Sequence, residues 1–311
     1  MRPALLGLLL LFAAPAWSAP PPERIIRVAE MHGLPPLDPV AAAWAKAPAV
    51  TLQLHPQSTV AGGPGGATLP VEARILRGGG QLAVRLAWAD TGENLLDARA
   101  TDRFADAVAV QFAPVGATLP YIGMGEPKKP VRLWLWRAGG KPERLTATGF
   151  GSLSKQGGAP PEAQSRRTAA GWEVVLRGKP DVPFTALAFA AWDGAEDGRA
   201  GRKRLSAWQA LIKPGGRLPA GLREEARPGG DAARGERLYA ELGCAACHGP
   251  QAGLAPDLTN AGNIHWPGYL RRAIREPAAF LVPGYAAIMP AFSLRPEEIE
   301  NLAAYLMKPS P

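Results

Sequence analysis

The sequence predicts a multidomain fold, in which an N-terminal antiparallel β-sandwich is followed by a small all-α domain. Three observations support this. Apolar residues recur at every second position in the first two thirds of the chain, a stretch rich in glycine and proline follows, and the apolar spacing near the C-terminus is helical. A length of 311 residues also exceeds what one hydrophobic core usually fills.

Residues 1–18 have the pattern of a secretory signal peptide. Arg2 precedes an apolar stretch that runs from Ala4 to Ala14, and the small residues Ala16 and Ser18 indicate cleavage after Ser18. The stretch is short for a membrane-spanning helix, although its retention as an anchor is an alternative. No later segment is long and apolar enough to cross a bilayer. We therefore expect an exported, periplasmic protein without a membrane span in its mature chain.

The net charge of +8 is unevenly distributed. From Asp231 to the end there are seven Lys/Arg and eight Asp/Glu, so the positive excess lies in the first 230 residues. The basic residues are dispersed and the protein is expected to be exported, which argues against nucleic acid as the partner. An acidic protein partner or another anionic surface fits this charge better.

The β-sandwich is expected at residues 24–213. Apolar stretches with period two, separated by turns rich in glycine and proline, are typical of short antiparallel strands. The clearest of them are QLAVRLAWAD (81–90), DAVAVQFAP (106–114), PVRLWLWRA (130–138), GWEVVLRG (171–178) and FTALAFAAWDG (184–194).

Residues 214–230 predict an extended linker, because the segment is rich in glycine, proline and charge. Residues 231–311 then predict helices. Asp231 can cap the first helix, a second spans 267–276 with proline at its first position, and a third begins at Pro296. This domain has few large apolar side chains, so something else is expected to fill its core.

The motif Cys244-Ala-Ala-Cys247-His248 contains both cysteines of the chain. Cys-x-x-Cys-His is the attachment motif of c-type haem, in which two thiols on one helical turn form thioethers with the porphyrin and the histidine binds the iron. A redox-active disulfide, a structural disulfide and a zinc site that includes His265 are alternatives. The first needs a βαβ unit, the second gives the histidine no role, and the third lacks ligands.

Residues 231–308 resemble a small class I cytochrome c. The matching stretches are GERLYAELGCAACHG, APDL, AAIMPAF and EIENLAAYL. The resemblance implies that Pro256 packs beside the proximal His248 and that Met289 is the second ligand of the haem c iron. With both axial positions filled, the domain would transfer electrons and bind no substrate at the iron. Arg295 stands where such domains often have a helix-capping serine or threonine, so we expect a weaker cap there.

Residues 38–213 resemble the haem-binding γ subunits of ethylbenzene dehydrogenase, dimethylsulfide dehydrogenase and related exported molybdenum enzymes. The resemblance rests on LDPVAAAWAKAPAVTLQL, DRFADAVAVQFAP, PYIGMGEPKKPVRLWLWRA and AFAAWDGAEDGRAGRKRLSAWQAL. It implies one non-covalent haem b, whose iron is held between Met124 and Lys203. Without the resemblance, we would expect Met124 to be a packed core residue and Lys203 to be a solvated charge on the surface.

Lysine binds iron only as the neutral amine, so burial must lower the pKa of Lys203. Arg202 and Arg204 would add to this effect or pair with haem propionates. His32 and His55 are the alternative ligands. Four tryptophans are expected in the sandwich core, with the last as a possible haem contact: Trp134, Trp136, Trp192 and Trp208.

Together these features predict a dihaem electron carrier, with one haem b and one covalent haem c, and not an enzyme. Its expected partners are the iron–sulfur subunits of a molybdopterin oxidoreductase and an external redox carrier. A dihaem peroxidase is disfavoured because such enzymes usually carry two Cys-x-x-Cys-His motifs. The other alternative is a single-haem cytochrome c fused to a non-haem β-sandwich that binds a ligand or partner.

Overall fold

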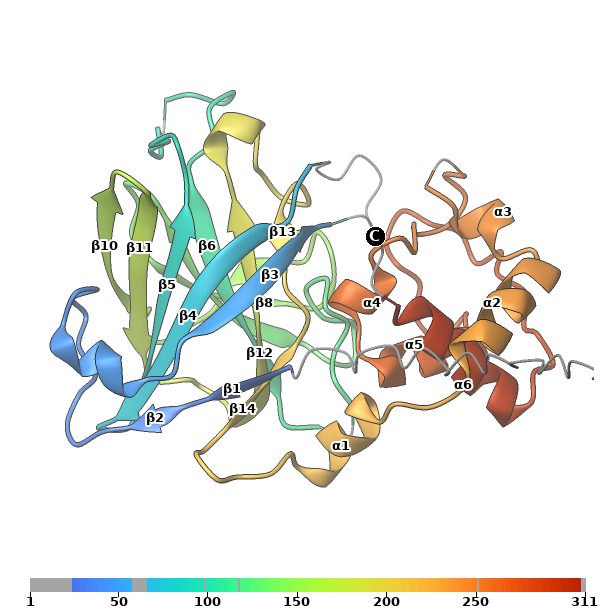
Figure 1. The fold of residues 1–311 in the computed structure, drawn as a ribbon. Coiled ribbons are helices and arrows are strands. Elements are labelled where there is room, and N and C mark those ends of the chain that lie inside the picture. The colour runs from blue at the N-terminus through green and yellow to red at the C-terminus, as the bar shows by residue number, and fades with distance from the viewer. Residues whose placement is uncertain (1–23, 58–65, 98, 117, 251, 309–311) are drawn as a thin grey trace, which may run out of the picture.

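The computed structural model describes residues 24–57, 66–97, 99–116, 118–250 and 252–308, which form two domains side by side (Figure 1). The predicted signal peptide lies outside the described residues. Within them, no helix is long and apolar enough to cross a membrane.

The N-terminal domain is built from antiparallel strands, as predicted. The strands and short 3-10 helices are β1 (Ile25–Arg27), β2 (Ala29–Glu30), η1 (Ala42–Lys46), β3 (Val50–Pro56), β4 (Leu69–Gly78), β5 (Gln81–Ala89), β6 (Ala107–Pro114), β7 (Val131–Arg137), β8 (Glu143–Ala147), β9 (Ser154–Lys155), β10 (Glu162–Thr168), β11 (Gly171–Gly178), β12 (Phe184–Trp192), η2 (Gly194–Glu196), β13 (Arg204–Leu205) and β14 (Gln209–Ile212). The five stretches singled out above correspond to β5, β6, β7, β11 and β12.

Hydrogen bonds join the strands in the order β10-β11-β5-β4-β3-β13-β12-β6-β7-β8-β9. β14 pairs with β12, and only the short β1 and β2 add parallel neighbours. The sheet folds over along the β3–β13 pairing, so that its two halves face each other. Between them lies the main core, to which β4 and β5 contribute aliphatic side chains, β7 contributes Trp134 and Trp136, and β6 contributes Val108, Val110 and Phe112.

The strands β12, β6 and β7 are mostly buried on both faces. Along β6 the large residues point into the sandwich, whereas Ala107, Ala109 and Ala113 point to the outer face and are also buried. A strand covered on both sides has a nearly continuous apolar sequence. The outer face of these strands is therefore covered by other parts of the chain.

The C-terminal domain is helical, as predicted. Its helices are α2 (Ala232–Glu241), α3 (Ala245–His248), α4 (Ala261–Ile264), α5 (Pro267–Arg275) and α6 (Pro296–Leu306). Asp231 caps α2 by accepting from the backbone N–H of Ala233 and Arg234. The cysteine motif lies beyond the end of α2, on the separate helix α3, because the chain turns at Gly243 with φ +67°.

Helices α2 and α6 cross at Gly235. A Cβ atom at this position would lie 1.9 Å from the carbonyl oxygen of Asn301, so only glycine permits this approach. One turn further on, the rings of Tyr239 and Tyr305 lie 5.2 Å apart. The start of α6 is better held than expected, because the Arg295 amide donates to Glu298 Oε2 at 2.8 Å.

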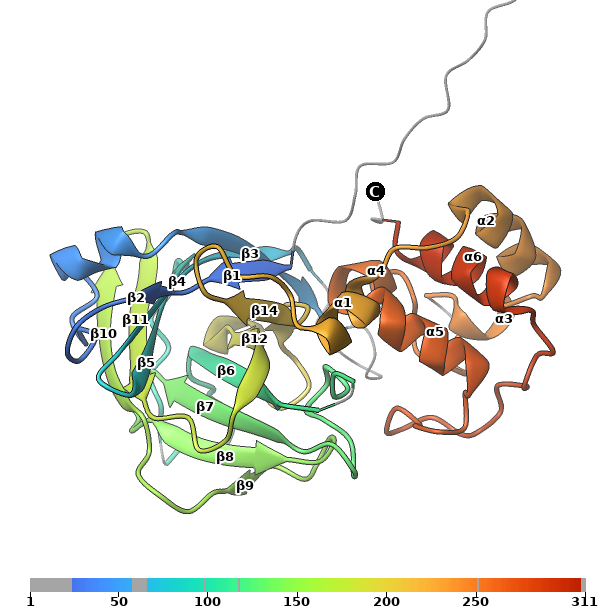
Figure 2. The same ribbon diagram turned by 90° about the horizontal axis from the view of Figure 1, so that it is seen from below.

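The segment predicted as an extended linker contains the helix α1 (Ala220–Ala226). Leu222 and Glu225 are buried, and Glu225 forms an ion pair with Arg272 of α5. Arg271 donates to the Glu224 carbonyl oxygen at 2.6 Å. A helix of seven residues is too short to be stable alone, so these contacts with α5 stabilise it. Figure 2 shows α1 next to α5.

Candidate functional site

A cavity of about 300 Å³ lies against the outer face of β6, β7 and β8. Its floor leaves room for a flat ligand, because β6 presents Ala107 and Ala109 there. Its walls come from the loops on either side of β6 and from the segment after β12. The lining is mostly apolar, with three arginines and one lysine: Leu96, Arg103, Phe104, Ala105, Ala107, Ala109, Met124, Leu133, Leu135, Arg137, Leu145, Leu153, Trp192, Gly198, Arg199, Ala200 and Lys203.

Lys203 is a buried lysine, not a surface charge. Its side chain lines the cavity and only 6% of the residue is exposed. Burial lowers the pKa of the amine from 10.5 to about 8. The Nζ atom lies 5.3 Å from the centre of the Trp192 ring. A lysine in this environment gives up its proton far more readily than an exposed one, as an amine ligand must.

Met124 lines the same cavity and has a left-handed backbone, with φ +75°. Such a conformation costs a non-glycine residue about 1–2 kcal/mol and persists only where the surroundings hold it. Here the Met124 carbonyl accepts from the Gly149 amide at 2.9 Å, and the Gly125 amide donates to the Tyr121 carbonyl at 2.9 Å. Strained backbone is common at binding sites, so the conformation of Met124 is consistent with a ligand-binding role for its thioether.

The chemistry of the lining fits a haem b. The residues include an amine of lowered pKa, a thioether and an apolar floor, and Arg103 and Arg199 could neutralise propionates, whereas Arg137 already pairs with Glu143. In the described part of the chain, the histidines considered as alternative ligands do not line the cavity. His55 Nδ1 instead lies 3.3 Å from Thr68 Oγ1.

Two neighbours of the cavity differ from expectation. Arg204 points to the opposite side of the strand from Lys203, where it pairs with Glu196, so it is not placed to meet propionates. Trp208 does not line the cavity but donates to the Pro120 carbonyl oxygen at 2.9 Å. Trp192, expected only in the core, is the tryptophan that lines the cavity. Side chains alternate between the two faces along the chain at β13, which places Arg204 away from the cavity. Trp208 packs instead against the 119–125 segment, which contains its acceptor Pro120.

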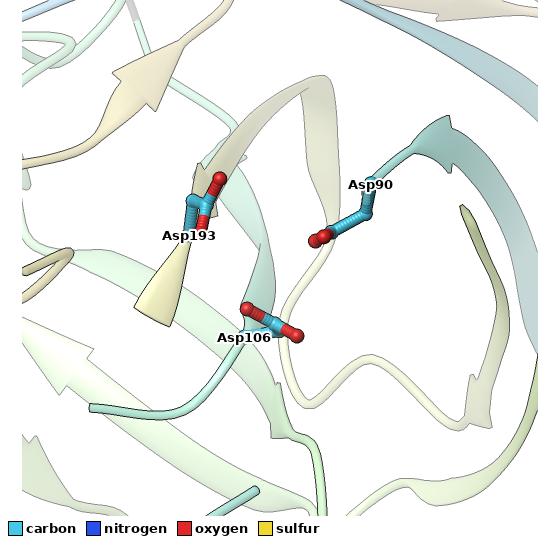
Figure 3. A group of neighbouring side chains, drawn as sticks. All are labelled: Asp90, Asp106 and Asp193. Carbon is cyan, nitrogen blue, oxygen red and sulfur yellow. The ribbon is translucent and has the colours of Figure 1, made fainter. Parts of the chain in front are cut away.

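Three aspartates, Asp90, Asp106 and Asp193, gather beside one wall of the cavity, with carboxylate oxygens within 4.8 Å of one another (Figure 3). Asp106 is fully buried and accepts three N–H groups: from the amides of Asn94 and Gly194 at 2.8 and 2.9 Å, and from Trp172 Nε1 at 3.1 Å. Burial and the two like charges raise the pKa of Asp90. Asp106 thus fastens the two loops that continue into the cavity walls.

Asp106→Ala is expected to lower the free energy of unfolding by about 3 kcal/mol, because three buried donors lose their acceptor. Urea unfolding would measure this. Asp193→Ala is the matched control, since among the described residues that carboxylate accepts one amide, that of Ala195, and its removal should cost about 1 kcal/mol. Equal unfolding midpoints for the two variants would contradict the role of Asp106.

The second site lies on α3. Cys244 precedes the helix and Cys247 lies on the same turn, so both thiols flank His248 on one short element. The Nδ1 atom of His248 lies 2.8 Å from the carbonyl oxygen of Pro256. A carbonyl oxygen only accepts, so Nδ1 carries the proton and Nε2 is the nitrogen available to a metal. The Pro256 backbone therefore orients the imidazole as a haem ligand requires.

Met289 lies, partly exposed, in the loop of residues 276–295 between α5 and α6. The same loop contains Tyr285, whose pKa is raised by burial and by the charge of Asp257, so this loop lies near the one that contains Pro256. Leu254, Leu281 and Ile288 of these loops are exposed although they are large and apolar. A flat apolar group between the loops would bury them, which fits a haem. The ligand role of Met289 stays a prediction.

Each of the two domains matches a known protein family. Residues 41–175 match the family described as ethylbenzene dehydrogenase, and residues 232–309 match cytochrome c. The chlorate reductase subunit gamma of Ideonella dechloratans is 37% identical over 217 residues, 63% of this chain and 88% of that protein. A protein of Haloferax mediterranei described as a respiratory nitrate reductase haem subunit is 33% identical over 188 residues, 56% of this chain and 67% of that protein.

Among solved structures, a family 9 carbohydrate-binding module from Caldicellulosiruptor kristjanssonii, in complex with glucose, covers 59% of this chain and 96% of its own at 8% identity. Its TM-score of 0.35 is too low to bear on function.

The fold and the two sites define a haem-binding electron-transfer subunit of an oxidoreductase, and not a catalytic subunit. More specifically, the chain belongs to the family of γ subunits that includes those of ethylbenzene dehydrogenase and chlorate reductase, here fused to a cytochrome c domain. The resemblance that was noted in the sequence is thereby confirmed.

Proposed function

We propose that this protein is an exported carrier of single electrons with two haems, a non-covalent haem b in the β-domain cavity and a covalent haem c on α3. The observation that carries the proposal is that Met124 and Lys203, far apart in the sequence, line one apolar cavity. The two haems would supply the one-electron chemistry, while the protein binds them and sets their environment.

In this proposal each predicted ligand has a defined task. Burial keeps the Lys203 amine easy to deprotonate, and the held turn presents the Met124 thioether. At the other site Cys244 and Cys247 tether the porphyrin covalently. His248 and Met289 would hold the haem c iron, and a thioether ligand would raise its reduction potential relative to a second histidine.

The partner we propose is the iron–sulfur subunit of a molybdopterin oxidoreductase of the nitrate, chlorate or selenate reductase type, or of a related dehydrogenase. The names of the two relatives support this class of complex. The positive excess in the first 230 residues would steer an acidic partner toward the β-domain. An external redox carrier would then meet the near-neutral cytochrome c domain.

Export to the periplasm belongs to the same proposal, and residues 1–18 support it by their composition. The intact mass of the secreted protein tests this point. A chain that begins at Ala19 is expected, whereas a chain that retains the leader would mean that the segment acts as an anchor.

A pyridine haemochrome assay before and after extraction with acidified acetone tests the two-haem proposal. We expect one extractable b-type haem and one retained c-type haem per chain, since only the latter is held by thioethers. A single retained haem with nothing extractable would instead support the alternative, a cytochrome c domain fused to a non-haem β-sandwich.

A further inference from the structure

The turn formed by residues 121–125, here called the Met124 turn, lies between the two domains. Its last part presents Met124 to the β-domain cavity, whereas its first residue, Tyr121, is only 1% exposed and packs against the cytochrome c domain. One short segment therefore contacts both halves of the molecule.

The cytochrome c domain surrounds Tyr121 with rings. The centre of the Tyr121 ring lies 4.8 Å from that of Phe280, 5.6 Å from that of Tyr269 and 5.8 Å from that of His265. His265 and Tyr269 stack on each other at 4.2 Å. Packed aromatic pairs of this kind stabilise beyond the area that they bury. Tyr121 is thus held from the side of the cytochrome c domain.

Hydrogen bonds fasten the start of the turn to the same domain. Trp266 Nε1 donates to the Trp208 carbonyl oxygen at 2.7 Å, and Trp208 Nε1 donates to the Pro120 carbonyl oxygen at 2.9 Å. Both indoles are buried. The residue that precedes Tyr121 is therefore linked, through one tryptophan, to the segment that starts α5.

The rest of the turn is fastened to the β-domain. The buried Gln111 donates its side-chain amide to the Ile122 carbonyl at 3.0 Å, and the Gly149 amide donates to the Met124 carbonyl at 2.9 Å. A Cβ atom at Gly123 would lie 2.5 Å from the Tyr121 ring. The Tyr121 ring therefore packs directly against the backbone next to Met124.

Phe280 belongs to the loop of residues 276–295, which also contains Met289. The Tyr121–Phe280 contact consequently joins the two segments that contain the predicted methionine ligands. Val282 and Tyr285 of the same loop extend this contact into the shared apolar cluster.

We propose that the cytochrome c domain positions Met124 for haem b through Tyr121 and Phe280. This inference rests on the proposed function, because it assumes that Met124 is a haem b ligand. The strained backbone of Met124 needs support from its surroundings, and the ring contacts of Tyr121 supply part of that support from the other domain. Tyr121 and Phe280 are positioning residues, and the coupling acts in both directions: haem b binding also favours domain docking.

Phe280→Ala in the purified full-length protein tests the proposal, because Phe280 lies outside the β-domain and is not among the residues that line the cavity. Transfer of the extractable haem to apomyoglobin is expected to become about tenfold faster. The low-spin fraction of haem b in electron paramagnetic resonance should fall, while the haem c spectrum stays as in wild type. Phe280→Tyr keeps the ring and should restore the wild-type rate.

Trp44→Ala is the matched control. Trp44 packs against the outer face of the opposite half of the sheet, so its loss removes more packing but none near the Met124 turn. Haem transfer from this variant should stay within about twofold of wild type. A tenfold faster haem transfer from Trp44→Ala would show that general destabilisation explains the effect of Phe280→Ala, and it would overturn the proposal.

Met124→Leu separates this inference from the proposed function. If Met124→Leu abolishes the low-spin signal of the extractable haem while Phe280→Ala leaves haem transfer and spectrum unchanged, the ligand assignment stands and the positioning role fails. If Met124→Leu has no effect on that haem, the assignment of Met124 fails, and the inference fails with it.

Discussion

Lys203→Leu is expected to stabilise the protein freed of extractable haem by about 3 kcal/mol at pH 7, and to abolish low-spin haem b in the untreated protein. At this pH the buried amine is mostly charged in the folded state. A pKa lowered from 10.5 to about 8 corresponds to that free-energy cost, which leucine of similar volume does not incur. Leucine cannot bind iron, so the ligand is lost with the charge.

The sign of the pH dependence follows from the direction of this pKa shift. Between about pH 8 and pH 10.5 the unfolded chain holds a proton on Lys203 that the folded protein has released. The stability of the wild type should therefore rise through this window, and the advantage of the variant should vanish above it. Below about pH 8 the wild type bears the full free-energy cost of the buried, charged Lys203 amine.

Urea unfolding at pH 7 and pH 10 measures this difference. Lys213→Leu serves as the control, because that lysine is exposed and forms a surface ion pair with Glu30, so its removal should change stability by less than about 1 kcal/mol. A Lys203→Leu protein that is less stable than wild type and retains its low-spin haem b would refute the ligand role of Lys203.

Replacing both Cys244 and Cys247 by serine is expected to unfold the cytochrome c domain while the β-domain keeps its strands. Among the residues that the structure describes, the helices share two small clusters of buried apolar residues, Ala261, Leu270 and Ala303 in one and Ile274, Ile299 and Leu302 in the other, while Ile264 and Trp266 pack in the cluster shared with the β-domain. So little buried surface does not offset the loss of chain entropy without a covalently held group.

Circular dichroism and limited proteolysis report this outcome. The helical signal should fall to the level of the β-domain and its short helices, and cleavage should concentrate after residue 230. Ser293→Ala, an exposed change in the same domain, should leave both measurements as in wild type. Retention of the full helical signal without covalent haem would show that the domain folds by its own core.

Local patterns in the sequence predicted much of the fold. The strands β5, β6, β7, β11 and β12 and the helices α2, α5 and α6 lie where periodicity placed them, because the spacing of apolar residues along one element is a local property. The Asp231 cap is local in the same sense. Helix α1 was missed because its sequence lacks these signals and its stability comes from ion pairs and hydrogen bonds with α5.

The cavity was predicted only through the family resemblance. Nothing near Lys203 in the sequence marks it as buried, and the nearby Arg202 and Arg204 suggest a surface. One signal was available: β6 alternates large residues with Ala107, Ala109 and Ala113, where a solvent-facing strand would have polar residues. This pattern indicates a covered outer face, although not what covers it.

The sequence by itself predicted the covalent haem site, because Cys244, Cys247 and His248 lie within five residues, so that local spacing alone brings the three side chains together. It also predicted most of the long strands and helices, although not α1. Only the tertiary structure decided that Met124 and Lys203 line one cavity, that Trp192 lies there in place of Trp208, and that Tyr121 meets the cytochrome c domain. These relations join residues that are distant in the chain, and they depend on how the folded sheet and the docked helices bury one another.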